Sequence, residues 1–305
     1  MQASVANFPL YLQPWWWDAA TGNPEEWQAA EVRSKSGQLL AYWPYLVKKR
    51  YGLPLRFASL PPFCPRSGPW LAEPPKGTTA SRALNRQWEY INTLEKQLPR
   101  LPYFKAKTPY TTQYLMPLQH NGWQVEKRYS YQLPTHELSR PDIEKRFASS
   151  VRNKLRLAQK NLSIRTGVTL EELLSLMRQV YKHRKDTAAK FPEAAFSRLF
   201  EACNSRGCSV SWSVRDSSNR TSAGGWFAYD HECVYTFILA SDPNNRQNGA
   251  TTLLLSEAIN WAIDRQLVFD FEGSHLPGVE KFYRSFGPIP KPYYVISKGI
   301  LNRLF

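Results

Sequence analysis

The chain has 305 residues, of which 42% are hydrophobic, a composition typical of a globular protein and not of a disordered one. No run of about 18 apolar residues is present, so no membrane-spanning helix is expected. The first residues lack the charged and apolar regions of a secretory signal. We therefore expect a protein of the cytoplasm, and peripheral association with the inner membrane face stays open.

The balance of charges favours anionic partners. Lys and Arg number 40 against 25 Asp and Glu, which gives a net charge of +15. Such a field attracts nucleic acid, acidic carrier proteins, phosphate-bearing cofactors or an anionic membrane. The cysteines have no Cys-x-x-Cys spacing and no nearby histidine pair, so neither a metal site nor a disulfide framework is expected.

In the first half, turn-rich and alternating segments predict strands before any helix. Two strands are expected around the Ser36-Gly37 turn, and the proline-rich stretch that follows is expected to be extended or looping. Apolar residues near a 3.6-residue period predict a helix over about 80–97. A shorter helix around 110–120 and a strand within 123–133 complete this half.

The second half combines helices with a mixed sheet. Residues 141–162 predict one basic helix with Pro141 in its first turn. Strands 232–240 and 267–272 are joined by a single helix, so they are expected to form a right-handed crossover and to lie parallel. The other expected elements are a short strand at 163–167, helices at 169–184 and 192–206, strands at 208–215 and 221–229, helices at 249–265 and 276–286, and a last strand at 291–298. We interpret the chain as α/β, with two copies of one α/β unit at 1–138 and 139–305, the second better formed.

The loop "NNRQNGATTLLLSEAINWAIDR" is the first candidate for chemistry. Arg246 and Gly249 stand at the entrance of a long helix, where unpaired N–H groups and the helix dipole favour an anion such as a pyrophosphate. Gly249 lets the anion approach closely, and Arg246 adds charge. The alternative is a helix that begins at a glycine, with an arginine on its surface.

Two motifs together resemble the GCN5-related N-acetyltransferase (GNAT) superfamily. "RQNGA" follows one strand and "FYRSFG" follows the next; the family's cofactor loop reads Q/R-x-x-G-x-G/A, and its last helix often carries Phe-Tyr before a glycine. Thr251 departs from the family's Gly or Ala. The longer run "FDFEGSHLPGVEKFYRSFG" with "VRNKLRLAQKN" is similar to the double-GNAT branch, which holds Fem-related aminoacyltransferases and BioF2-like acetyltransferases. The resemblance is best from about 140 to 297.

The resemblance implies tandem GNAT-like domains, the second with a cleft between two splayed parallel strands. There the pantetheine arm of an acyl thioester lies like a missing strand. Tyr283 takes the role of the acid that protonates the departing thiolate; the alternative is a core tyrosine with a buried hydroxyl bond. The residues expected to bind the cofactor are Leu239, Ala240, Arg246, Gln247, Asn248, Gly249 and Ala250.

An amine that attacks a thioester must be neutral, so a base or an ordered water has to take a proton. Glu272 and His275 follow the strand end most closely and are the candidates. A carboxylate at a cleft mouth can have a raised pKa, and histidine titrates near neutral pH. The alternatives are a capping or ion-paired role for Glu272 and a solvated loop position for His275.

The function expected is N-acyl transfer from an acyl-CoA or an acyl carrier protein to an amine acceptor, in cell-envelope or specialised-metabolite biosynthesis, without a metal. The first alternative is a Fem-like transferase that uses aminoacyl-tRNA; Fem enzymes usually have Phe-Lys where this chain has Phe282-Tyr283. Basic residues over 145–160 suit tRNA phosphates: Lys145, Arg146, Arg152, Lys154, Arg156 and Lys160. The second alternative is a non-catalytic binding module in which tryptophans stack bases. The tryptophans can also fill a core or line an acceptor groove for sugar or lipid, and for Trp16 and Trp17 packing is the favoured interpretation.

Overall fold

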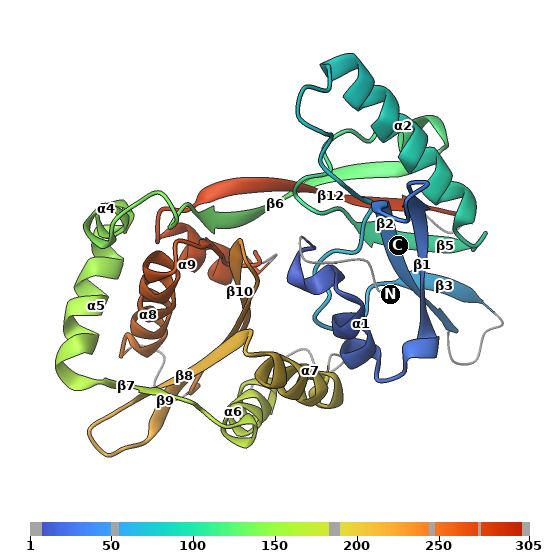
Figure 1. The fold of residues 1–305 in the computed structure, drawn as a ribbon. Coiled ribbons are helices and arrows are strands. Elements are labelled where there is room, and N and C mark those ends of the chain that lie inside the picture. The colour runs from blue at the N-terminus through green and yellow to red at the C-terminus, as the bar shows by residue number, and fades with distance from the viewer. Residues whose placement is uncertain (1–7, 50–54, 183–189, 244–247, 274–275, 301–305) are drawn as a thin grey trace. The chain divides into compact units, whose positions relative to one another are not determined.

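The computed structural model describes residues 8–49, 55–182, 190–243, 248–273 and 276–300. The chain forms two compact units, Met1–Tyr129 with Pro292–Phe305, and Ser130–Lys291, whose elements are labelled in Figure 1. This division differs from the contiguous one expected at residue 138. The reason is the last strand, β12 (Ile289–Lys298), which pairs antiparallel with β5 (Tyr103–Lys107) and so returns the chain to the first unit.

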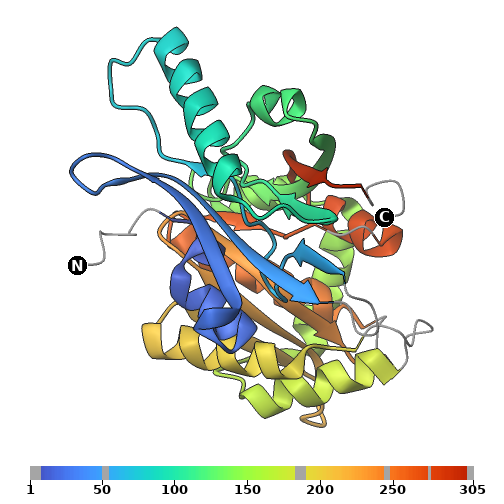
Figure 2. The same ribbon diagram turned by 90° about the vertical axis from the view of Figure 1, so that its right-hand side faces the viewer.

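The first unit is built on an antiparallel hairpin. Strands β1 (Trp27–Arg33) and β2 (Leu39–Lys49) pair on either side of Gly37, whose φ of +84° suits glycine, so the predicted turn is confirmed. The order continues through β3 (Arg56–Ser59), β5 and β12, and β4 (Trp70–Leu71) pairs with β2. The predicted helix is also confirmed as α2 (Ala80–Gln97), which packs on β1 and β2; Figure 2 shows it in teal above the blue hairpin. The shorter helix, α3 (Met116–His120), begins later than predicted.

Tryptophans fill the core of the first unit. Trp16 and Trp17, on α1 (Pro14–Thr21), and Trp43, on β2, have no exposed surface. The indole N–H of Trp17 donates to the carbonyl of Tyr11 at 2.9 Å, and the ring of Trp43 lies 5.3 Å from that of Trp123. Packing, not base stacking, therefore accounts for Trp16 and Trp17.

The second unit is a mixed sheet covered on both faces. Its strands run in the order β6 (Gln124–Leu133), β11 (Val268–Asp270), β10 (Cys233–Ser241), β9 (Thr221–Tyr229), β8 (Ser209–Arg215) and β7 (Ser163–Thr166). Neighbouring residues of a strand point to opposite faces. Phe227 accordingly packs with α8 (Ala250–Asp264), whereas Trp226 contacts Phe196 on α7 (Glu193–Arg206). Helix α6 (Leu170–Lys182) also contacts β9 and β10.

The prediction of one helix over 141–162 is wrong. The segment forms α4 (Arg140–Arg146) and α5 (Ser149–Asn161), with extended backbone at Phe147 between them. Phe147 is buried, and its ring lies 5.1 Å from that of Phe286. The N–H of Ala148 donates to the carbonyl of Ser285 at 2.8 Å. Core burial of one aromatic side chain therefore overrides local helix propensity.

No helix in the described ranges combines the length and the apolar character needed to cross a bilayer. Among the same residues, no group of three or more His, Cys, Asp or Glu side chains is arranged to hold a metal ion.

Candidate active site

Strands β10 and β11 are parallel, as predicted, but they pair over only three residues. The pairs are Cys233 with Val268, Val234 with Phe269 and Tyr235 with Asp270. Strand β11 then ends, whereas β10 continues to Ser241 along β9, with a register shift between Thr236 and Ile238. Beyond Tyr235, this edge of β10 has no strand partner among the described residues. An unpaired edge offers N–H and C=O groups that an extended ligand can bind as an added strand.

Leu239 and Ala240 lie on this unpaired length of β10. They pair on the other side with Gly225 and Gly224 of β9. Leu239 is partly exposed and Ala240 is buried. Both are therefore placed beside the open edge, and their contact with a cofactor stays a prediction.

Helix α8 begins at Gly249, which is left-handed with φ of +82°. A Cβ at this residue would lie 3.0 Å from the carbonyl oxygen of Lys154 and 3.1 Å from the Cβ of Ala158. Glycine is thus needed both for its backbone angle and for the close approach of α5. Gly249 itself has no side chain with which to cap α8, and the helix dipole at this end favours an anion.

Asn248 precedes Gly249 in the same loop. The side-chain oxygen of Asn248 accepts a hydrogen bond from the N–H of Ala250 at 2.9 Å. In this structure the N–H of Ala250 is therefore occupied, and N–H groups further into the first turn are better placed for a phosphate. Arg246 and Gln247 lie outside the described residues, and so does His275.

Tyr283 lies on α9 (Pro277–Arg284) in an apolar setting. It is buried, and its ring lies 5.1 Å from that of Phe271. Burial raises its pKa to about 12, with a further contribution from the negative charge of Glu272. No hydrogen-bond partner for its hydroxyl is found among the described residues. The tyrosine is therefore protonated at neutral pH and able to donate.

Glu272 follows directly after β11 and is close enough for its charge to act on Tyr283. Its φ is +57°, a left-handed conformation that side chains other than glycine seldom adopt and that often marks functional positions. The carboxylate is partly exposed. The structure thus brings together two of the three predicted catalytic residues, a proton donor and a carboxylate.

Sequence reasoning missed the residue that supports this arrangement. Asp270 has no exposed surface, and its carboxylate accepts hydrogen bonds from the Ser130 hydroxyl at 3.1 Å and the Gln132 amide at 2.9 Å. It also accepts from the N–H of Glu272 at 2.7 Å. A buried charge held in this way fixes the backbone turn that carries Glu272. An acidic residue between Phe269 and Phe271 was the available signal.

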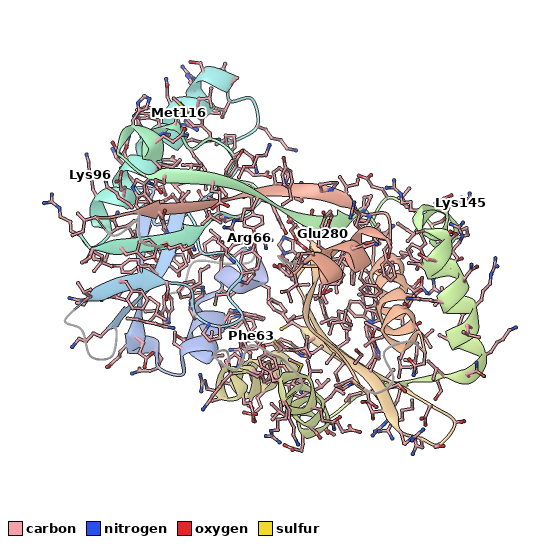
Figure 3. All side chains as sticks on the ribbon, turned by 180° about the vertical axis from the view of Figure 1, so that it is seen from behind. Phe63, Arg66, Lys96, Met116, Lys145 and Glu280 are labelled. Atoms are coloured by element: carbon pink, nitrogen blue, oxygen red, sulfur yellow. The ribbon has the colours of Figure 1, made fainter. Side chains whose placement is uncertain are left out.

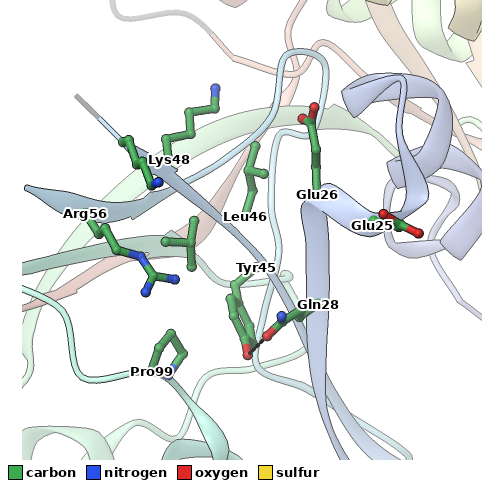
Figure 4. Close-up of a pocket in the computed structure, with 10 residues that line it drawn as sticks. Glu25, Glu26, Gln28, Tyr45, Leu46, Lys48, Arg56 and Pro99 are labelled. Atoms are coloured by element: carbon green, nitrogen blue, oxygen red, sulfur yellow. Dashed lines mark hydrogen bonds between the residues drawn. The ribbon is translucent and has the colours of Figure 1, made fainter. Parts of the chain in front are cut away.

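Two pockets lie elsewhere on the chain. One, of about 460 Å³, is in the first unit and is lined by carboxylates and cations; Figure 4 shows its hydrogen bond from the Tyr45 hydroxyl to Gln28. The other, of about 720 Å³, lies beside β8 and is lined in part by Trp212, Glu257 and Trp261. Neither contains a residue of the predicted cofactor or catalytic sets.

Comparison with known proteins agrees with this fold. Residues 145–283 match the model of the acetyltransferase (GNAT) domain family. The structure of FemX is similar with a TM-score of 0.68 at 14% identity, over 94% of this chain and 92% of that chain. L-PGS from Bacillus licheniformis gives 0.52 at 10%, over 90% and 84%.

A tandem GNAT protein from the clavulanic acid biosynthesis pathway gives a TM-score of 0.50 at 11% identity, over 90% of this chain and 84% of that chain. At such identities the likeness is one of fold. No curated protein matches the chain in sequence. Residues 145–283 thus match a GNAT domain, and the fold of the chain as a whole is similar to that of FemX and of a tandem GNAT protein.

Proposed function

We propose that this chain is an N-acyltransferase that moves an acyl group from a phosphopantetheine thioester, of coenzyme A or an acyl carrier protein, to an amine. The observation that carries the proposal is the open edge of β10 beyond Tyr235. A pantetheine arm contains amide groups, which can pair with that edge as a strand does. The start of α8 is suited to the phosphates.

Glu272, which follows β11, and Tyr283, on α9, supply the proton transfers. The amine nitrogen attacks the thioester carbonyl, the new C–N bond forms, and the C–S bond breaks. Glu272 accepts the proton that the amine loses, and Tyr283 donates a proton to the leaving sulfur. The products are an amide and a thiol. A pKa of about 12 keeps Tyr283 in the donating form.

The test combines donor binding with turnover. Acetyl-CoA, a long-chain acyl-CoA and a charged tRNA are each titrated in a thermal shift assay; a ligand at 100 times its Kd stabilises the folded protein by about 2.7 kcal/mol. Tyr283→Phe is expected to lower kcat at least 100-fold in transfer to a panel of amines, with donor affinity unchanged. Tyr129→Phe, at a tyrosine that is 51% exposed, is the control. Equal turnover of Tyr283→Phe and wild type contradicts the proposed role of Tyr283, and no turnover by wild type with any donor favours a non-catalytic module.

An aminoacyl-tRNA-dependent reaction is the second candidate. Two observations favour it: the likeness to FemX over 94% of this chain and the exposed basic residues of α5. A melting temperature that rises only with charged tRNA selects this reaction. The acceptor class proposed for either donor is an amine of a cell-envelope precursor or a specialised metabolite, and the proposed location is the cytoplasm or the inner membrane face.

A further inference from the structure

One cationic surface of the second unit has no part in the site described above. Helix α5, "SSVRNKLRLAQKN", carries four basic residues and no acidic one. Its buried side is formed by Val151, Leu155 and Ala158, and the four basic side chains are exposed, as is Arg146 on α4. Figure 3 shows the long side chains of α4 and α5 projecting outward, with Lys145 labelled. The α5 face is defined as Arg146, Arg152, Lys154, Arg156, Leu157 and Lys160.

The charges of the α5 face have no acidic partner in the part of the chain that the structure describes. Lys145, its neighbour on α4, pairs with Asp142 at 3.0 Å, whereas the five cations of the α5 face have no carboxylate within 4.0 Å among the described residues. Elsewhere in the same unit arginines commonly have carboxylate partners, as in Arg178 with Glu193 and Arg215 with Glu172. An unneutralised patch of this kind attracts a polyanion or an acidic protein.

The face also has an apolar centre, which distinguishes these two partners. Leu157 is 56% exposed, and Lys154 and Lys160 stand three residues before and after it, so they flank it on the helix surface. An apolar residue ringed by charge is the pattern of a protein interface, with an apolar core and a polar rim. A tRNA bound through its phosphates requires cations alone, so that partner does not account for the exposed Leu157.

The α5 face adjoins the start of α8. Gly249 approaches α5 so closely that an added Cβ would lie 3.0 Å from the Lys154 carbonyl oxygen. A phosphate bound at the first turn of α8 would therefore have the α5 face beside it. The 13 residues of α5 extend about 20 Å at 1.5 Å each, far more than one nucleotide phosphate requires.

We propose that the α5 face docks an acidic carrier protein whose phosphopantetheine arm brings the thioester to β10. The inference rests on the proposed function and names the donor within it. Cations around Leu157 steer and orient the carrier, and the arm passes by the start of α8 to the open strand edge. Free acyl-CoA uses the same strand edge without needing the α5 face.

The experiment measures binding of an acyl carrier protein that holds its acyl group through a stable amide, and of acyl-CoA, by calorimetry. In Arg156→Glu/Lys160→Glu, affinity for the carrier is expected to fall at least tenfold, while affinity for acyl-CoA stays within twofold. The control, Arg82→Glu/Arg86→Glu on α2, makes the same charge change at the same spacing on exposed side chains. It is expected to leave both affinities within twofold.

The apolar centre is tested separately. Leu157→Ser is expected to weaken carrier binding several-fold, whereas Leu84→Ser, at a leucine that is 45% exposed, is expected to leave it unchanged. Equal carrier affinity in wild type and the α5 double variant overturns the docking proposal. Loss of tRNA binding in that variant, with no carrier binding to wild type, assigns the face to nucleic acid and also overturns it. Failure of both carrier and acyl-CoA to bind wild type counts against the proposed function instead.

Discussion

Replacing Asp270 tests the support of the site, because this side chain joins the sheet to the turn that carries Glu272. One carboxylate oxygen accepts hydrogen bonds from Ser130 and from the N–H of Glu272, and the other accepts from Gln132. Hydrogen bonds to a charged group contribute about 1.5–3 kcal/mol each, and a buried donor without its acceptor costs about 1–3 kcal/mol.

Two variants of Asp270 separate charge from hydrogen bonding. Asp270→Asn keeps an oxygen for two donors but turns an N–H₂ group toward the Gln132 amide, so we expect a loss of about 2–3 kcal/mol in the free energy of unfolding. Asp270→Ala leaves three donors without an acceptor, and we expect about 3–5 kcal/mol. Urea unfolding measures both losses, provided that the m-values agree with that of wild type.

The control is Asp264→Asn, which removes a carboxylate that is 49% exposed and pairs with Arg140. Exposed ion pairs contribute about 0–1 kcal/mol, so this variant should unfold almost as wild type does. Hydrogen exchange at the Glu272 amide should also become faster in Asp270→Ala, because that N–H loses its acceptor. If both Asp270 variants lie within about 0.5 kcal/mol of wild type, the buried carboxylate does not hold the turn and the reasoning fails.

Three further predictions concern the second unit. Gly287→Ala places a Cβ 2.4 Å from the carbonyl oxygen of Arg146 at φ +68°, whereas at Gly167, with φ +66°, an added Cβ has nothing within 4 Å. In urea unfolding we expect Gly287→Ala to lose about 2–4 kcal/mol of the free energy of unfolding and Gly167→Ala about 1–2 kcal/mol. Equal losses would contradict the clash. The pKa of Tyr283 is raised from 10.0 to about 12, so the contribution of its protonated form to stability is full below pH 10 and is lost as pH rises toward 12. The free energy of unfolding measured between pH 9 and 11 should therefore fall more steeply in wild type than in Tyr283→Phe. Parallel curves would refute the shift. Thr169 caps α6 in a reciprocal pair of hydrogen bonds with the glutamate three residues later, so Thr169→Ala should lower the melting temperature by the equivalent of about 1 kcal/mol, and an unchanged temperature would show that this cap is dispensable.

Local patterns were sufficient for most elements. The helix over 80–97 could be predicted because its apolar residues recur with the helical period, and it is observed at Ala80–Gln97. The parallel pairing of β10 with β11 followed from the single helix between them. The break at Phe147 could not be predicted, because what ends α4 there is burial against Phe286, far along the chain.

Some residues of the candidate site could be predicted from the sequence and others could not. Gly249 could be identified because a glycine before a long helix allows an anion to approach the helix N-terminus closely. Tyr283 was identified through the resemblance to GNAT proteins. For Asp270 the one local sign was its place between two phenylalanines, because its partners Ser130 and Gln132 precede it by 140 and 138 residues. Contacts at that separation depend on the register of β6 against β11, which a single sequence does not reveal.

The backbone of Glu272 has a consequence for anyone who redesigns this protein. At φ +57°, replacing Glu272 by glycine would relieve a backbone strain of about 1 kcal/mol. A design algorithm that scores backbone energy will therefore favour Glu272→Gly, which removes the carboxylate. A sequence optimised in that way keeps its shape and discards the proposed proton acceptor. Glu272 keeps its side chain although its backbone conformation favours glycine. A substitution there that raises the melting temperature is therefore expected to lower turnover.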